Sequence, residues 1–290
     1  MVLLPLIALI LNFGFIGTVF QFPRKADEAK VGNSHIKIGS YNIHGFKFGL
    51  RPLTVRMISD FMKENEVTIL CLQEVDYDSV YTIDSIANAF DYLPYRALAK
   101  SEVPGFNLMV LSKYPIVNST RIRFHRSANQ AMFTDLLIHK DTIRVFNFHL
   151  QTTNFNQARF PLVPQSWFWD LSGEARKSMT VYDVLTFNYR KRIKQANYIH
   201  SEIEKTTYPT LVCGDMNSIP ASHTYHQIKG HHLHDGFTTC GSGYEYTMKG
   251  LYRLYRIDYI FHTEDFKGYS YHSYLLDYSD HKPVIMECGY

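Results

Sequence analysis

A carboxylate and an amide stand two positions apart in the stretch Gly214-Asp215-Met216-Asn217. An apolar run at 211–213 precedes them, and Pro220 closes the segment because proline cannot donate a hydrogen bond inside a sheet. In an extended chain, side chains two residues apart project to the same side. Asp215 could then deprotonate a water molecule while Asn217 binds that water or a neighbouring anionic oxygen. Taken alone, these residues are equally typical of a tight turn after a strand.

Further polar residues stand where predicted strands end, which is where a rigid scaffold would hold a site. They are Asn42, Glu74, His149, Asp258, Asp280 and His281. Each has a plainer explanation by itself: asparagine caps turns, and a single histidine is more often part of a core or loop than catalytic. Asp258 is the most informative, because a carboxylate among the apolar residues of a strand is costly unless it is paired. His281 is its natural partner.

The elements that would position these residues are predicted from hydrophobic periodicity. Strands are expected at 35–43, 67–72, 107–112, 131–139, 143–150, 211–214, 256–262 and 284–287. Helical spacing is found at 51–65, 82–90, 184–205 and 222–229. Residues 152–182 have no clean period and are expected to form loop and short helix. Strands and helices alternate in two comparable halves, which indicates an α/β protein.

The composition is that of a chain able to bury a sizeable core, as one large domain or two small ones. It has 290 residues, of which 46% are hydrophobic, and a formal net charge of +3. Such mild basicity permits a phosphate-bearing partner without predicting one. The four cysteines (Cys71, Cys213, Cys240 and Cys288) show no C-x-x-C spacing, and we expect them to be reduced.

The N-terminal residues 2–20 carry no charge, which predicts a membrane anchor formed by a single helix. A helix of that length spans roughly 28 Å, about one hydrocarbon core. Arg24 and Lys25 follow the run, so the positive-inside rule favours a cytoplasmic catalytic domain. The alternative is a signal peptide and an exported protein. The expected organisation is an anchor at 1–22, a linker at 23–35 and a catalytic domain at 36–290.

Six short motifs in order resemble the endonuclease/exonuclease/phosphatase superfamily, which has the DNase-I-like fold. They are Ser40-Tyr41-Asn42, Leu72-Gln73-Glu74, Asn147-Phe148-His149-Leu150, Gly214-Asp215-Met216-Asn217, Arg256-Ile257-Asp258-Tyr259 and Ser279-Asp280-His281. Each is weak alone, but six in this order are specific, and they cover about residues 36–288. The loop Gly241-Ser242-Gly243 and the strand start at 141–144 resemble membrane-anchored bacterial members of unassigned substrate.

The resemblance implies a four-layer αββα sandwich, in which two mixed β-sheets pack face to face with helices outside and the site at the sheet edge. The implied activity is divalent-metal-dependent hydrolysis of a phosphoester by in-line attack of water. Glu74, helped by Asn42, would hold Mg²⁺ or Mn²⁺, because few hard oxygen ligands suit an ion that keeps water and binds phosphate. Asp280 would be a second metal ligand or the partner of a histidine.

The resemblance also implies the other roles. Asp215 would orient and deprotonate the attacking water, and Asn217 would hold that water or a phosphate oxygen. His281, oriented by Asp258, and His149 would contact the phosphate and stabilise developing charge. Arg256, inside one motif, is counted with Asn217 and His149 as a substrate-binding residue.

One position departs from the pattern of the family. Some nuclease members carry an acid two residues after the first asparagine, where this chain has His44; this puts in doubt a second metal position and a close tie to abasic-site endonucleases. The segment His149-Leu150-Gln151 resembles the sphingomyelinase branch. A sphingomyelinase-type lipid phosphodiesterase is therefore the alternative to a nuclease-type phosphodiesterase. A catalytically silent module that binds a phosphorylated ligand is the alternative outside the enzyme class.

The expected partners are a phosphate-bearing substrate, either nucleic acid or a lipid headgroup, and the membrane; the chain is expected to be a monomer.

Three other groups could bind ligands. Histidines between 223 and 234 could bind a transition metal, but no cysteine or acid completes a spacing, which favours a solvated loop. The basic run 190–194 could meet nucleic acid or anionic lipid, or be a solvated helix face. Trp167, Trp169 and the tyrosines at 244–255 could stack on bases, touch a headgroup or be core.

Overall fold

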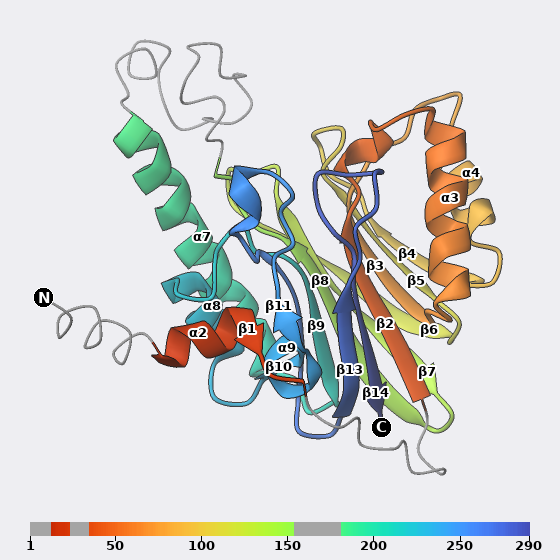
Figure 1. Cartoon of the computed structure of the whole chain (residues 1–290). Helices are drawn as coiled ribbons and strands as arrows, with labels where there is room; N and C mark the ends of the chain where they lie inside the picture. The colour runs from red at the N-terminus through yellow and green to blue at the C-terminus, as the bar shows by residue number, and fades with distance from the viewer. Residues whose placement is uncertain (1–12, 24–34, 154–180) are drawn as a thin grey trace, which may run out of the picture.

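The computed structural model describes residues 13–23, 35–153 and 181–290. Two six-stranded β-sheets pack face to face, and helices cover both outer faces (Figure 1). The four-layer α/β sandwich that the sequence predicts is confirmed.

The first sheet has one parallel pair of strands at its centre. In chain order it consists of β2 (His35–Asn42), β3 (Ile69–Val75), β4 (Tyr95–Ala99), β5 (Asn107–Ser112), β13 (Lys267–Ser273) and β14 (Val284–Gly289). Across the sheet the order is β13-β14-β2-β3-β5-β4. The strands β2 and β3 are parallel and all other neighbours are antiparallel.

The second sheet is also mixed. It consists of β6 (Ile116–Arg123), β7 (Gln130–Ile138), β8 (Asp141–His149), β9 (Thr210–Asp215), β10 (His234–Asp235) and β12 (Asp258–His262). Across the sheet the order is β10-β12-β9-β8-β7-β6. Here β8 and β9 are the parallel neighbours. Each sheet thus carries a parallel pair whose carboxyl ends can approach those of the other pair.

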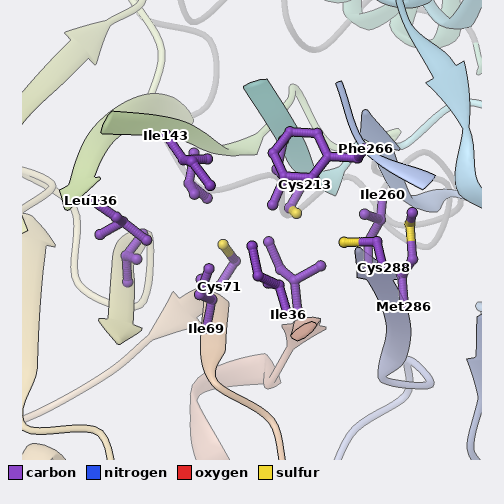
Figure 2. Packing of buried hydrophobic residues seen from close by; sticks show 14 of the residues in the cluster. Ile36, Ile69, Cys71, Leu136, Ile143, Cys213, Ile260, Phe266, Met286 and Cys288 are labelled. Carbon is purple, nitrogen blue, oxygen red and sulfur yellow. The ribbon is translucent and has the colours of Figure 1, made fainter. Parts of the chain in front are cut away.

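The core between the sheets is made by their inward-facing side chains. Ile69 and Cys71 of β3 face Ile143 of β8 and Cys213 of β9, and all four are fully buried (Figure 2). Burying an aliphatic side chain of this size stabilises the folded protein by roughly 1.5–3 kcal/mol, so this layer stabilises the packing of the two sheets. The four cysteines are free thiols.

The outer layers are amphipathic helices. The helices α3 (Arg51–Glu64) and α4 (Ile83–Ala89) cover the first sheet, and α7 (Val181–Ile203) and α8 (His223–Lys229) cover the second (Figure 1). Val55, Ile58 and Met62, three and four positions apart on α3, are fully buried against the sheet. The shorter pieces are η1 (His44–Phe46), α9 (Gly236–Cys240) and η3 (Leu251–Arg253).

The strands expected from sequence are present with shifted ends, and the two-residue strands at 20–21, 234–235 and 243–244 were not predicted. Three longer strands were not predicted either: β4, β6 and β13, each an edge strand of its sheet. Four consecutive residues of β6 are exposed, and β13 has one buried residue. A strand with a single neighbour and little burial has no strong hydrophobic pattern, which explains why periodicity misses it.

The described part of the N-terminal segment packs onto the sandwich. The helix α2 (Phe13–Val19) leads into β1 (Phe20–Gln21), which pairs with β11 (Gly243–Tyr244). No helix within the described ranges is both long and apolar enough to span a bilayer. Most of the predicted anchor and linker (1–12 and 24–34) and the region 154–180 lie outside the described residues, so the anchor stays a prediction.

Candidate active site

Five predicted site residues come together where strands of both sheets end. Asn42 is the last residue of β2, and Glu74 lies one residue before the end of β3. His149 and Asp215 are the last residues of β8 and β9 and lie opposite each other in the parallel pair. Asp258 begins β12 directly opposite Asp215. The parallel pairing of each sheet therefore brings these side chains to one edge.

Unusual backbone conformations at Gly214 and Glu74 help to place the side chains of Asp215 and Glu74 at this edge. Gly214 has φ 148°, and a Cβ there would lie 2.1 Å from the carbonyl oxygen of Phe148. Only glycine lets β9 approach β8 this closely. Glu74 has φ 54°, beside a register irregularity between β3 and β5. A non-glycine residue in the left-handed region is strained. Such strain persists only where the surrounding structure enforces it, which is common at functional sites.

Asp215 is at the centre of the site and is 1% exposed. Its Oδ2 accepts a hydrogen bond from Nδ2 of Asn42 at 3.0 Å and lies 3.6 Å from Nε2 of His149 and 3.8 Å from Nε2 of His281. Its Oδ1 accepts from the backbone N–H of Asn217 at 2.8 Å. The Asp215 carboxylate thus contacts four residues of the site, namely Asn42, His149, Asn217 and His281.

His281 is held by a carboxylate on the side away from Asp215. Its Nδ1 lies 2.9 Å and 3.2 Å from the two carboxylate oxygens of Asp258. The hydroxyl of Thr247 accepts the backbone N–H of Asp258 at 3.0 Å, and the hydroxyl of Ser279 accepts that of His281 at 3.1 Å. This arrangement leaves Nε2 of His281 directed at Asp215, as in an acid–base pair with an orienting group.

His149 has no such partner. It is fully buried, and neither ring nitrogen has a hydrogen-bond partner among the described residues. Its ring stacks on Phe106 with centroids 5.8 Å apart, and its Nε2 lies 3.6 Å from both Glu74 and Asp215. A buried, unsatisfied nitrogen between two acids is a group prepared to bind a ligand atom.

The surroundings of Asp215, His281 and His149 shift their pKa values in different directions. Burial, followed by the charge of Asp258, raises the pKa of Asp215 to about 6, against the opposing effect of the two histidines. Burial acts to lower the pKa of His281, but the adjacent Asp258 and Asp215 outweigh it and raise the pKa to about 10. Burial lowers the pKa of His149. At neutral pH the site therefore holds an ionised Asp215, a protonated His281 and a neutral His149.

Two further acids face the open side of the site. The side chains of Glu74 and Asp280 are 21% and 33% exposed, and Nδ1 of His44 lies 3.6 Å from one and 3.5 Å from the other. Nδ2 of Asn42 donates to Glu74 at 3.1 Å. Burial raises the pKa of Glu74, which shows that its charge lacks full compensation. Partly exposed hard oxygen donors of this kind fit a Mg²⁺ or Mn²⁺ ion that keeps bound water.

Asp215, Asp258 and His281 also satisfy the spacing of a metal site, since one ligand atom of each lies within 4.8 Å of the others. However, Asp258 and His281 are already hydrogen-bonded to each other and buried. Such a trio can act as a base with its orienting groups. Glu74 and Asp280 are partly open to solvent and could hold a metal ion.

The structure does not bring Arg256 into the site. Its guanidinium is fully buried, forms an ion pair with Asp235 and donates to the carbonyl oxygen of Thr18 in the N-terminal segment. A guanidinium with no exposed surface does not contact a substrate in this conformation. Asn217 does reach the site: its Nδ2 donates to the carbonyl oxygen of Leu150 at 3.1 Å, beside the Asp215 carboxylate that its N–H binds.

Sequence reasoning gave no role to a polar network beneath the site. Nε2 of Gln73 donates to Oδ1 of Asn147 at 2.8 Å, across the two sheets. Nδ2 of Asn147 donates to the carbonyl oxygens of Leu72 and Met109, both at 3.0 Å. Both residues lie inside motifs quoted above, and a polar residue amid a buried strand is the signal that identifies them.

The other candidate groups provide none of the side chains that contact Asp215 within the described part of the chain. In the basic run, Arg192 is buried and donates to the carbonyl oxygen of Gln151. His232, in the histidine-rich stretch, is exposed and lies 3.8 Å from Glu204. Trp167 and Trp169 are outside the described residues.

Comparison with solved structures shows the same fold in several proteins. An endonuclease/exonuclease/phosphatase from Beutenbergia cavernae is 17% identical, with a TM-score of 0.64 over 88% of this chain and 71% of that one. D. rerio TDP2, in a complex with a single-strand DNA product, is 13% identical, with a TM-score of 0.62 over 89% of this chain and 100% of that one. A Bacteroides thetaiotaomicron family protein is 13% identical, with a TM-score of 0.62 over 89% and 98%.

No curated protein matches the sequence. The model of the Endonuclease/Exonuclease/phosphatase family matches residues 39–281, a range that contains all the motifs and every residue of the site. The chain therefore belongs to the endonuclease/exonuclease/phosphatase family.

Proposed function

We propose that the protein is a divalent-metal-dependent phosphodiesterase that hydrolyses its substrate by direct attack of water. The observation that carries this proposal is the position of the buried Asp215, whose Oδ2 lies within 3.0–3.8 Å of Asn42, His149 and His281. A base with a raised pKa, a protonated histidine and open carboxylates at one edge form the machinery that phosphoryl transfer to water needs.

In this mechanism Asp215 takes a proton from a water molecule while the water oxygen attacks phosphorus, and the P–O bond to the leaving group breaks, so that an alkoxide departs. Asn217 holds Asp215 in place and positions the water. His281, charged and oriented by Asp258, donates to a phosphate oxygen, and neutral His149 donates through Nε2 to another. Glu74 and Asp280 would hold a Mg²⁺ or Mn²⁺ ion, which supplies positive charge for the phosphate and the departing oxygen.

The test uses the full chain in detergent with Mg²⁺ or Mn²⁺ and an aryl phosphodiester. We expect Asp215→Asn to lower kcat by about 10³-fold, and His281→Ala by about 10²-fold or more, with unchanged circular dichroism. Exposed Arg56 lies on α3, so Arg56→Gln is the matched control. Wild-type rates in either site variant would refute the mechanism.

A silent phospho-ligand-binding module would share the fold but need no metal. Calorimetry with Mg²⁺ separates the two functions: we expect binding in the wild type that Glu74→Gln weakens at least 10-fold. Mg²⁺ binding that is absent, or unaffected by this change, favours the silent module.

The substrate class is proposed as nucleic acid or a lipid headgroup, and activity on single- and double-stranded nucleic acid, sphingomyelin and phosphoinositides would decide it. We also propose that residues 2–20 tether a monomeric enzyme to a membrane with the catalytic domain in the cytoplasm. The support is the uncharged run followed by Arg24 and Lys25. N-terminal sequencing of the membrane fraction tests this, because a cleaved N-terminus would indicate export instead.

A further inference from the structure

A cavity of about 390 Å³ opens beside the active site. It is lined by residues that follow β4, by the end of β6 and by the β6–β7 loop. The described residues of this lining include three arginines and a histidine (Arg121, Arg123, Arg126 and His125) and one acid, Glu102. No residue of the cavity belongs to the catalytic machinery described above, so its charge requires a separate explanation.

Arg121 and Arg123 are the central residues of this cavity. They are two positions apart on β6 and therefore project from the same face of the strand. Burial and the nearby charge of Arg123 lower the pKa of Arg121. Nε of Arg121 donates to Oε1 of Gln130 at 2.5 Å, a neutral partner that orients the guanidinium without neutralising it.

The one acid compensates this charge weakly. Arg123 lies 3.4 Å from Glu102, and both side chains are about two-thirds exposed (67% and 64%). An ion pair of this kind contributes little and is easily exchanged for a better anion. The two adjacent guanidinium groups of Arg121 and Arg123 thus keep most of their positive charge, which favours binding of an anion.

A single layer of residues separates this cavity from the catalytic edge. Nε2 of Gln130 donates to the carbonyl oxygen of Phe106 at 2.9 Å, and the ring of Phe106 stacks on His149. Nδ2 of Asn129, another lining residue, donates at 2.9 Å to the carbonyl oxygen of Leu150, which also accepts from Asn217. The cavity is therefore linked to His149 through Phe106 and to Asn217 through the carbonyl oxygen of Leu150.

We propose that this cavity binds a second phosphate group of the substrate, so that the enzyme selects phosphodiesters carrying another phosphate near the scissile one. This inference rests on the proposed function and narrows its substrate class. The fork of a guanidinium matches phosphate oxygens in two parallel hydrogen bonds, and two such groups suit a dianion. A nucleotide with a neighbouring phosphate and a ring-phosphorylated inositol phosphodiester both present this chemistry.

The experiment compares pairs of substrates that differ by one phosphate. The nucleotide pair is the nitrophenyl ester of thymidine 5′-phosphate with and without a 3′-phosphate. The inositol pair is glycerophosphoinositol with and without ring phosphates. The full chain with Mg²⁺ should favour the additional phosphate in one pair, which identifies the source. Arg121→Gln or Arg123→Gln should lower that preference about 10-fold, mainly through KM, and leave the single-phosphate ester within twofold.

Two controls distinguish a failure of the second-phosphate site from a failure of the proposed hydrolase activity. Arg56→Gln should leave all substrates unchanged, and Arg123→Gln is expected to fold because its side chain is mostly exposed. Calorimetric titration with inorganic pyrophosphate in EDTA gives a readout independent of hydrolysis: the wild type should bind and both cavity variants should bind at least 10-fold more weakly. Equal kcat/KM within both pairs, or pyrophosphate binding that both variants retain, overturns the second-phosphate site. If no ester is hydrolysed, the proposed function fails and the pyrophosphate titration still decides the cavity.

Discussion

Asp258→Asn tests the electrostatic argument for His281 while preserving the shape of the site. The Asp258 carboxylate lies 2.9 Å and 3.2 Å from Nδ1 of His281. Its effect is the largest of the three carboxylate effects that, against burial, raise the pKa of the histidine from 6.5 to about 10. A rise of that size corresponds to roughly 5 kcal/mol in favour of the protonated ring, at about 1.4 kcal/mol per pH unit. The asparagine removes the charge of Asp258, and the pKa then depends on burial, which lowers it, and on Asp215, which still raises it.

The expected result is a defect that grows with pH. Where these two effects balance, the pKa returns to its ordinary value of 6.5. About 1% of the histidine would then be protonated at pH 8.5, so kcat/KM should fall about 100-fold there. Near pH 6 most of the histidine remains protonated in either protein, and the loss should be less than about 3-fold. The assay is kcat/KM for an aryl phosphodiester from pH 5.5 to 10 with Mg²⁺.

A loss of the same size at every pH would refute this reasoning, because it would show that Asp258 acts by shape alone. Thermal unfolding gives an independent check. The folded pKa of His281 lies above its unfolded value, so its stabilisation is complete below pH 6.5 and is lost as pH rises through about 10. The difference in Tm between wild type and Asp258→Asn should therefore shrink as pH approaches 10.

The remaining predictions concern the base and the scaffold. Since the raised pKa of Asp215 is about 6, wild-type kcat/KM should rise about tenfold per pH unit up to that value and then level off, and a flat profile from pH 4.5 to 7 would contradict its role as base. Gly214→Ala should lower Tm by about 5–10 °C, because its Cβ would lie 2.1 Å from a backbone oxygen. Gly250→Ala, with nothing closer than 3.7 Å, should change Tm by less than about 2 °C, and equal losses in both would refute the argument. Asn147→Leu should cost about 2–4 kcal/mol in urea unfolding, because it removes the shortest hydrogen bond of Gln73 and the side-chain donor to two buried carbonyl oxygens. A neutral result would mean that the network is dispensable.

The sequence by itself determined the buried strands and most of the residues at their ends. Runs such as 67–72 and 211–213 are apolar on both faces, and a polar residue directly after such a run, such as Glu74 or Asp215, stands out locally. The order of the six motifs then indicated the family, which the match over residues 39–281 confirms. These signals are carried by neighbours along the chain, so no tertiary contact is needed to detect them.

Only the tertiary structure decided which polar residues meet. The strands β4, β6 and β13 escaped prediction because edge strands bury little, and the arginine-lined cavity is built on one of them. Arg256, in a motif beside Asp258, turns away to pair with the buried Asp235, and Asn147 bonds to Gln73 from the opposite sheet. The raised pKa values of Asp215 and His281 likewise depend on burial and on charges far away in sequence. Such effects depend on distances between segments that lie far apart in the sequence, and sequence periodicity does not encode these distances. For this reason the fold and most residues of the candidate site could be predicted, whereas the protonation states and the cavity could not.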